Sequence, residues 1–398
     1  MRKLSLTDAT FIGLASMLGA GVFVVFGFAA ALAGSLLPIS IFLAAVVAYL
    51  NAGSVAQLAA VVTRSGAGYA YGRQYLSKTW GFMAGTSFLI GKIGSSAVIA
   101  MTIANYLFPS VAQIAAIAAV VVMTIINLLG INRTALGSKI LALITIGFLV
   151  SLIASASGLP DANTTLAPGN LVGVLSAASI FFFAFAGYAR VATLGGEVGN
   201  SKKIVPIAIW ISLAIVLLLY LVLALILMSK LGGDLAKTVT PLADLSQLSF
   251  SSGEIAGVFA AIAGLGSLLA LLAGMSRTTS EMGIDSELPR FMSKKLANGS
   301  PYIAEILVSL AVVLLVLLGS TLTALGISSF CVLVYYAITN WAGFRQPRQE
   351  TTRPKYLNLL GFSLCLLLAL SVPLSGLING AALLAIAMSL RWGLRALR

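Results

Sequence analysis

The chain has 398 residues, of which 60% are hydrophobic and only 9% are charged, and its mean hydropathy is +1.06. Soluble domains do not have this composition, whereas helical membrane proteins with many spans do. The net charge of +13 does not indicate a nucleic-acid partner, because the basic residues are spread over short loops instead of forming one basic face. Because the chain has no histidine, metal sites and proton relays that use histidine are excluded. We expect no metal or cofactor.

Apolar stretches of about 20 residues predict membrane spans, because a helix of that length crosses the hydrocarbon core. The first stretch is too long for a signal peptide and lacks a small-residue cleavage site, so we expect no cleavable signal peptide. The twelve predicted spans cover residues 9–33, 36–60, 80–104, 110–130, 136–157, 171–194, 204–230, 254–283, 302–319, 321–342, 356–373 and 375–391.

The lysines and arginines predict the orientation of the chain. If the N-terminus is cytoplasmic, all but four of the 24 lie in inner loops and termini. The exceptions are Lys230 and Lys237 in outer loops and Lys92 and Arg190 within spans. Basic loops stay on the cytoplasmic side. We therefore expect a multi-pass protein in the lipid bilayer of the cell membrane, with both termini in the cytoplasm.

Both cysteines lie within apolar segments. Cys331 falls in the tenth predicted span and Cys365 in the eleventh. This placement argues against a disulfide framework, and we expect no disulfide-linked partner subunit.

The first and sixth predicted spans carry small residues near their centres, at Gly19–Gly21 and Ala184–Gly187. A helix that unwinds within the membrane exposes backbone groups, which are tolerated only when protein buries them or a wet cavity adjoins them. Two broken helices in corresponding halves of a membrane chain indicate the substrate site of a transporter. The alternative is that the small residues only allow close helix packing.

The two breaks suit opposite charges. Unwinding at Gly19–Gly21 would present the N–H groups and positive dipole end of the second half-helix to a carboxylate. Carbonyl groups released around Ala184–Gly187 could receive an ammonium group. Because a zwitterion needs both, an amino acid is the natural small-molecule ligand.

Five segments, in order along the chain, carry a recognisable pattern. They are GLASMLGAGVF in the first span, RSGAGYAYGRQYLSKTWGFMAG in the first inner loop, FFFAFAGYARVATLGGEVGNSKKIVPIAI in and after the sixth span, SRTTSEMGIDSELPRFMSKK at the end of the eighth and YYAITNWAGFR at the end of the tenth. As a set they resemble the amino acid–polyamine–organocation (APC) superfamily over the whole chain.

The resemblance implies an all-α integral membrane fold of the leucine-transporter type, with about twelve helices of which helices 1 and 6 are broken. One transporter domain would cover residues 1–398. Its inverted repeats would be residues 1–157 (spans 1–5) and 171–342 (spans 6–10), and two further helices would lie within 356–391. Alternating access would act around a site at the middle of the membrane, between spans 1, 3, 6, 8 and 10.

The resemblance also assigns site residues. Those that would meet the substrate carboxylate are Ser16, Gly19, Ala20 and Gly21. Those that would supply amine-binding carbonyls and pocket walls are Phe182, Ala184, Phe185 and Gly187. Tyr188 would gate the cytoplasmic side. Arg190 follows the sixth-span break and would belong to the inner gate, with Glu197 or Asp8 as its partner, or line the inner vestibule.

Three residues are candidates for ion coupling. Thr145 stands where some relatives carry a lysine in the fifth span, so their lysine mechanism does not simply transfer. Lys92 lies near the middle of the third span, where a charge is costly unless it is paired, neutral or near water. It is either a proton-coupling group or a structural lysine. Sodium coupling through Ser267 of the eighth span is a less favoured alternative.

The substrate prediction depends on the absence of acidic residues from the middle of the spans that would form the site. No Asp or Glu lies deep in spans 1, 3, 6, 8 or 10. A cationic side chain would lack an acidic partner there, so we expect a secondary transporter of neutral amino acids that is proton-coupled or an exchanger. Cationic amino acids or polyamines remain an alternative, and an anionic substrate would need Lys92 or Arg190 in the pocket. An enzyme is not expected, and a channel or solute sensor is the alternative class.

Overall fold

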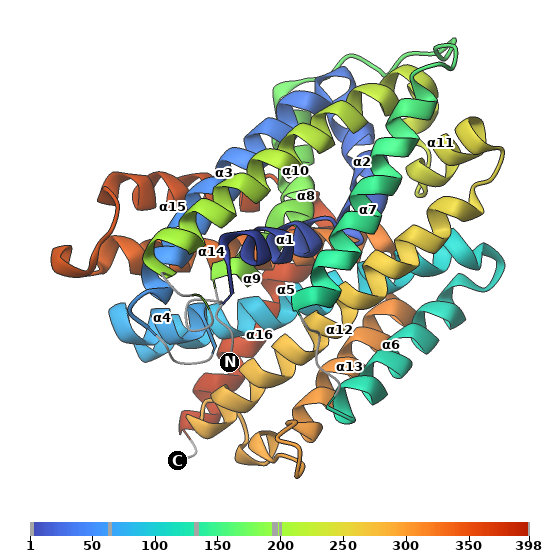
Figure 1. Ribbon diagram of the computed structural model, residues 1–398. Helices are drawn as coiled ribbons and strands as arrows, with labels where there is room; N and C mark the ends of the chain where they lie inside the picture. Colours follow the sequence, from blue (N-terminus) through green and yellow to red (C-terminus); the bar gives the residue numbers. More distant parts are fainter. Residues whose placement is uncertain (1–3, 63–65, 131–134, 193–197, 199–200, 397–398) are drawn as a thin grey trace. The chain divides into compact units, whose positions relative to one another are not determined.

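The structure is a computed structural model that describes residues 4–62, 66–130, 135–192, 198 and 201–396. These residues form α-helices and short 3₁₀ turns, with one isolated β-bridge between Leu4 and Val198. The prediction of an all-helical chain is confirmed. Figure 1 follows the helices from the N-terminus in blue to the C-terminus in red.

The chain divides into two compact units. The first unit comprises Met1–Ala52, Ile99–Ala116 and Arg133–Ser267, and the second comprises Gly53–Val98, Ile117–Asn132 and Leu268–Arg398. The helices with most of their residues in the first unit are α1 (Leu6–Met17), α2 (Gly21–Ala33), α3 (Leu37–Ala59), α7 (Ala135–Ala156), α8 (Leu171–Phe185), α9 (Ala189–Ala192), α10 (Ser201–Leu231) and α11 (Pro241–Phe250).

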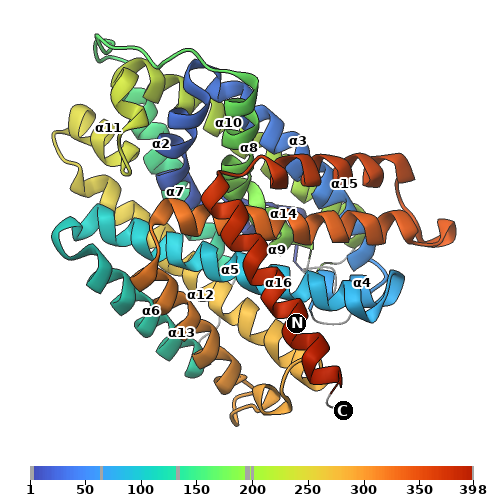
Figure 2. The ribbon, with the colours of Figure 1, turned by 180° about the vertical axis from the view of Figure 1, so that it is seen from behind.

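The second unit takes its helices mainly from the later part of the chain. They are α4 (Gly68–Tyr75), α5 (Lys78–Leu107), α6 (Ala112–Leu128), α12 (Glu254–Ile284), α13 (Tyr302–Leu318), α14 (Thr321–Arg345), α15 (Lys355–Leu370) and α16 (Leu374–Ala396). Figure 2 shows α14 and α15 running side by side in this unit, and α16 also packs on α14.

Nine segments of the described chain are long and apolar enough to cross a membrane. One of them, Gly21–Ala59, holds two helices joined by a 3₁₀ turn at Gly34–Leu36, and α13 and α15 are apolar but shorter. Short interruptions separate α13 from α14 and α15 from α16, as predicted. The layout of twelve spans in two inverted repeats stays a prediction.

The first predicted span is broken, as its small residues indicate. α1 ends at Met17, and α2 begins at Gly21. The start of α1 is fixed by a capping box, in which the backbone N–H of Asp8 donates to the Ser5 hydroxyl and the Ser5 N–H donates to the Asp8 carboxylate at 3.0 Å. α2 has no such cap, because its N-cap residue is Ala20.

The sixth predicted span is also broken, but slightly later than its small residues indicate. α8 continues through Ala184 and ends at Phe185. A 3₁₀ turn, Ala186–Tyr188, then leads into the single turn of α9. A tighter 3₁₀ turn redirects the chain without releasing all of its backbone groups, so this break is a change of helix type.

Within the first unit, the two parts of the first span pack on different partners. α2 packs along α8, whereas α1 packs along α10 and α7 (Figure 1). The break between α1 and α2 therefore separates two groups of helix contacts.

Candidate functional site

The two helix breaks lie against each other inside the first unit. A Cβ atom added at Gly21 would lie only 2.9 Å from the Cα of Ala184. One added at Gly187 would overlap the carbonyl oxygen of Ser16. Both positions need glycine because backbone of the other break fills the space that a side chain would take. The glycines that the sequence marks as flexible thus also serve as contact points.

Tyr220 of α10 joins the two breaks. Its hydroxyl donates to the carbonyl oxygen of Met17, the last residue of α1, at 2.8 Å. It also lies 3.3 Å from the carbonyl oxygen of Ala184, in a longer and weaker contact. The side chain is fully buried, and its ring packs on Phe26, Phe181 and Phe185. One phenol therefore holds backbone from both broken helices.

The start of α2 is suited to an anion. Its N-cap, Ala20, makes no side-chain hydrogen bond, so no hydroxyl or carboxylate of the cap covers the first N–H groups of the helix. Gly21 and the residues that follow it are buried. A buried helix N-terminus carries a partial positive charge and outward-pointing donors, which favour a carboxylate.

The serine and threonine hydroxyls of the predicted site bond within their own helices. Ser16 donates to the carbonyl oxygen of Ile12 at 2.8 Å, and Ser267 donates to that of Ala263 at 2.9 Å. Gly19 lies directly against Ser267, because a Cβ atom added at Gly19 would overlap the Ser267 hydroxyl. Thr145 is buried on α7 and donates to the carbonyl oxygen of Leu141 at 2.9 Å. The structure thus brings Ser267 to the first break.

The second break presents mainly packed aromatic residues. Phe182, Ala184 and Phe185 are buried, and the ring of Phe185 lies 5.2 Å from that of Tyr220. The carbonyl oxygen of Phe183 already accepts the N–H of Ala186. Phe185 is therefore a packing residue as well as a predicted wall.

The two predicted gate residues differ in exposure. Tyr188 is fully buried, whereas Arg190 is exposed on α9. Of the proposed partners for Arg190, Glu197 lies outside the described residues, and Asp8 caps α1 through Ser5.

Lys92 belongs to the second unit and lies half-buried on α5. Within the described chain it has no hydrogen-bond or ion-pair partner. A lysine with a structural role at this depth is expected to bond carbonyl groups or a carboxylate. The surroundings of Lys92 therefore do not support a purely structural role.

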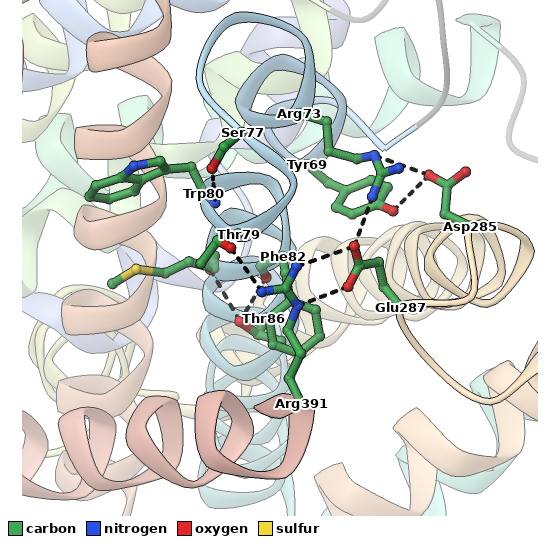
Figure 3. A network of polar contacts seen from close by, with 11 residues as sticks. Tyr69, Arg73, Ser77, Thr79, Trp80, Phe82, Thr86, Asp285, Glu287 and Arg391 are labelled. Atoms are coloured by element: carbon green, nitrogen blue, oxygen red, sulfur yellow. Dashed lines mark hydrogen bonds and ion pairs between the residues drawn. The ribbon is translucent and has the colours of Figure 1, made fainter. Parts of the chain in front are cut away.

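A second polar site lies in the second unit and was missed from the sequence. Figure 3 shows Tyr69 and Arg73 of α4 pointing toward Asp285 and Glu287, which follow α12, and Arg391 of α16 approaching Glu287 from the other side. Burial and the hydrogen bond to Asp285 raise the pKa of Tyr69 well above its usual range, so its hydroxyl stays a donor. The available signal was four charged residues in a chain of which only 9% of the residues are charged.

Tyr220 was missed as well. Its signal is a single tyrosine within the otherwise aliphatic run LLLYLVLALIL. The polar tip of a buried tyrosine has to find a hydrogen-bond partner, and in a membrane span few are free.

Known proteins match almost the entire chain. The profile of the family described as "Amino acid permease" covers residues 4–387. An uncharacterized transporter of Mycobacterium tuberculosis is 38% identical over 396 residues, which is 98% of this chain and 90% of that protein. The branched-chain amino acid permease of Bacillus subtilis is 27% identical over 334 residues (76% and 72%), and the methylthioribose transporter of the same organism is 26% identical over 322 residues (74% and 69%).

These matches agree with the apolar helices of the structure and indicate a multi-pass membrane transporter. Because the family profile spans nearly all of its residues, the chain belongs to the amino acid permease family of the APC superfamily.

Proposed function

We propose that the protein is a secondary active transporter of neutral amino acids that works by alternating access. The observation that carries this proposal is the pair of broken helices, which lie in contact and are joined by Tyr220. A substrate bound at a helix break meets backbone groups that move with the half-helices, so binding and conformational change are linked.

In the proposed site, the substrate carboxylate lies at the start of α2, where the cap leaves the helix dipole uncompensated. The residues assigned to this end are Ser16, Gly19, Ala20 and Gly21. The ammonium group lies at the end of α8 and the 3₁₀ turn after it. The residues assigned to that end are Phe182, Ala184, Phe185 and Gly187. Tyr188 and Arg190 follow the second break and are assigned to the cytoplasmic gate.

A neutral side chain fits this chain best. No carboxylate lies deep in the spans that would form the site, so a cationic substrate would enter an apolar region without a counter-ion. A relative named for branched-chain amino acids supports the same class, although another is named for methylthioribose, which is not an amino acid. Cationic amino acids and polyamines are the second candidate class.

Counterflow in proteoliposomes tests the proposal. Vesicles containing the purified protein are loaded with one unlabelled compound at a time, from a panel of neutral, cationic and anionic amino acids, a polyamine and methylthioribose. We expect saturable uptake of labelled substrate with neutral amino acids. Exchange of none of the amino acids would refute the amino acid proposal, and non-saturating flux would indicate a channel.

We further propose that transport is proton-coupled or an exchange, with Lys92 as the leading coupling residue. Thr145 and Ser267 are the weaker candidates, since each hydroxyl bonds its own helix. The test compares Lys92→Met with Lys78→Met, which removes an exposed charge from the same helix. We expect only Lys92→Met to lose the pH dependence of uptake. Normal transport with unchanged pH dependence in this variant would refute the role.

We also infer the layout of the chain. One transporter domain would span residues 1–398, with inverted repeats at 1–157 and 171–342 and two final helices within 356–391. It would lie in the cell membrane with both termini in the cytoplasm. The support is the distribution of lysine and arginine along the chain and the family membership.

A further inference from the structure

A buried ionic cluster joins four segments of the second unit (Figure 3). We call it the α4 cluster, and its residues are Tyr69, Arg73, Thr79, Asp285, Glu287 and Arg391. They come from α4, the start of α5, the turn after α12, and α16. The proposed transport mechanism uses none of them.

Glu287 lies at the centre of the cluster. Its Oε1 accepts hydrogen bonds from Nη1 of Arg73 at 2.9 Å and from Nη2 of Arg391 at 3.3 Å. Its Oε2 accepts from Nε of Arg391 at 2.8 Å. The side chains of Arg391 and Glu287 are only 2% and 3% exposed, whereas that of Arg73 is 20% exposed. The carboxylate is thus shared between one arginine from α16 and one from α4.

Arg391 is fixed on two further sides. Its Nη1 donates to the hydroxyl of Thr79 at 3.1 Å, and its guanidinium carbon lies 4.8 Å from the centre of the Phe82 ring. A planar guanidinium can bind a carboxylate with two donors and stack on an aromatic ring at the same time, whereas a lysine ammonium cannot. The geometry therefore uses the particular shape of arginine.

α4 depends on such contacts for its own structure. It has eight residues, and an isolated helix of this length is unstable in water. Its polar attachments include the ion pair of Arg73 with Glu287, the hydrogen bond from the Tyr69 hydroxyl to Asp285 at 2.7 Å, and the N–H of Gly68 donating to the Tyr335 hydroxyl at 3.1 Å. At its C-terminal end the Tyr75 hydroxyl donates to Glu350 at 2.7 Å. The attachments of Tyr69 and Arg73 end on the turn that carries Glu287.

We propose that α16 acts as a strap that holds α4 in its docked position. Arg391 fixes the carboxylate of Glu287, and Glu287 in turn holds Arg73 of α4. Breaking the Arg391–Glu287 pair would leave a buried carboxylate with one partly exposed arginine, which is costly. The turn would then move toward water, and α4 would lose both of its attachments to it. The docking of α4 is thereby controlled from a helix near the other end of the chain.

Hydrogen–deuterium exchange on the purified full-length protein tests the strap. In Arg391→Gln we expect the amides of α4 to exchange roughly tenfold faster than in the wild type, because a buried ion pair has lost one partner. Arg391→Lys should give an intermediate rate, since the charge stays but the fork is lost. The matched control is Arg345→Gln, which removes an exposed arginine at the end of α14 and should leave α4 unchanged.

An internal reference distinguishes local release from unfolding. α11 is a short helix of the first unit, and its exchange should be the same in all variants. Unchanged exchange in α4 of Arg391→Gln would refute the strap, as would equal acceleration in α4 and α11. The measurement needs no substrate, so its result stands apart from the counterflow test of the proposed function.

Discussion

The Tyr220 hydroxyl connects residues that are far apart in the sequence, Met17 at a separation of 203 residues and Ala184 at 36. Such a contact fixes the distance between two helix ends that have lost their regular hydrogen bonds. The surrounding rings of Phe26, Phe181 and Phe185 exclude water from it. In this environment an unmade hydrogen bond is more costly than at a surface.

Tyr220→Phe should slow transport while leaving the protein folded. The substitution keeps the ring and removes only the hydroxyl, and a hydrogen bond of this kind contributes about 1 kcal/mol, or roughly a fivefold change in an equilibrium constant. We expect the counterflow rate to fall at least that much with little change in the unfolding temperature. Tyr49→Phe, which changes a tyrosine that is 42% exposed, is the control. Equal rates in Tyr220→Phe and the wild type would contradict the positioning role.

Gly21→Ala should disrupt the contact between the breaks. The added methyl group would lie 2.9 Å from the Cα of Ala184, so backbone has to move, and such overpacking costs about 1–3 kcal/mol. We expect a lower unfolding temperature and loss of counterflow. Gly147→Ala on α7 adds the same methyl group where no heavy atom lies within 4 Å, and it should behave as the wild type. If both variants behaved alike, the close approach of the breaks would be wrong.

At the scale of helices, much of the structure follows from apolar length. Helix bounds agree with the predicted spans within a few residues, because a run of apolar residues between charged loops has one favourable conformation in a bilayer. The first break was predictable because Gly19 and Gly21 lack side chains that favour a helix. The 3₁₀ turn at Ala186–Tyr188 was not, since its type depends on contacts with α1.

The polar contacts between helices were the least predictable part. Tyr220 and the α4 cluster join residues separated by between 36 and 312 positions, and a single sequence does not say which distant polar groups meet. Composition shows only that such groups need partners.

The segment between α7 and α8 is attached to the end of α10. Nζ of Lys230 donates to the carbonyl oxygen of Leu159 at 2.6 Å and to the carboxylate of Asp161 at 2.8 Å, and the Ser229 hydroxyl also donates to Asp161. The hydrogen bond from Lys230 and then that from Ser229 lower the pKa of Asp161. The attachment is therefore strongest when Asp161 is ionised.

This attachment should weaken in acid. Because the pKa of Asp161 is lower in the folded protein than in the unfolded chain, its contribution to stability is present above the usual aspartate pKa and is lost as the pH falls through the lowered value. We expect Asp161→Asn to unfold at a lower temperature than the wild type at pH 7. The difference should shrink as the pH is lowered past the usual aspartate pKa, and it should disappear once Asp161 is protonated in the folded protein. A difference of equal size at pH 7 and in acid would show that charge is not its cause.

At the scale of the whole molecule, the basic residues and the proposed site together predict how the chain is oriented in the membrane. The two ends of the first span face opposite sides of the membrane. Which side the start of α2, the proposed carboxylate site, faces therefore depends on the orientation of the chain. The positive-inside distribution predicts that orientation, because moving lysines and arginines across a bilayer is strongly disfavoured. The outer positions would include Lys230 and Lys237.

Reporter fusions test the orientation directly. Green fluorescent protein attached after Arg398 should fluoresce, because it folds in the cytoplasm, and alkaline phosphatase attached there should be inactive. Alkaline phosphatase inserted between α10 and α11, next to Lys237, should be active. Replacing Lys230 and Lys237 with glutamine should leave this pattern unchanged, since the many inner charges set the orientation. An active phosphatase at the C-terminus would reverse the assignment of both faces. It would also place Tyr188 and Arg190 on the outer side of the break, which would exclude them from a cytoplasmic gate.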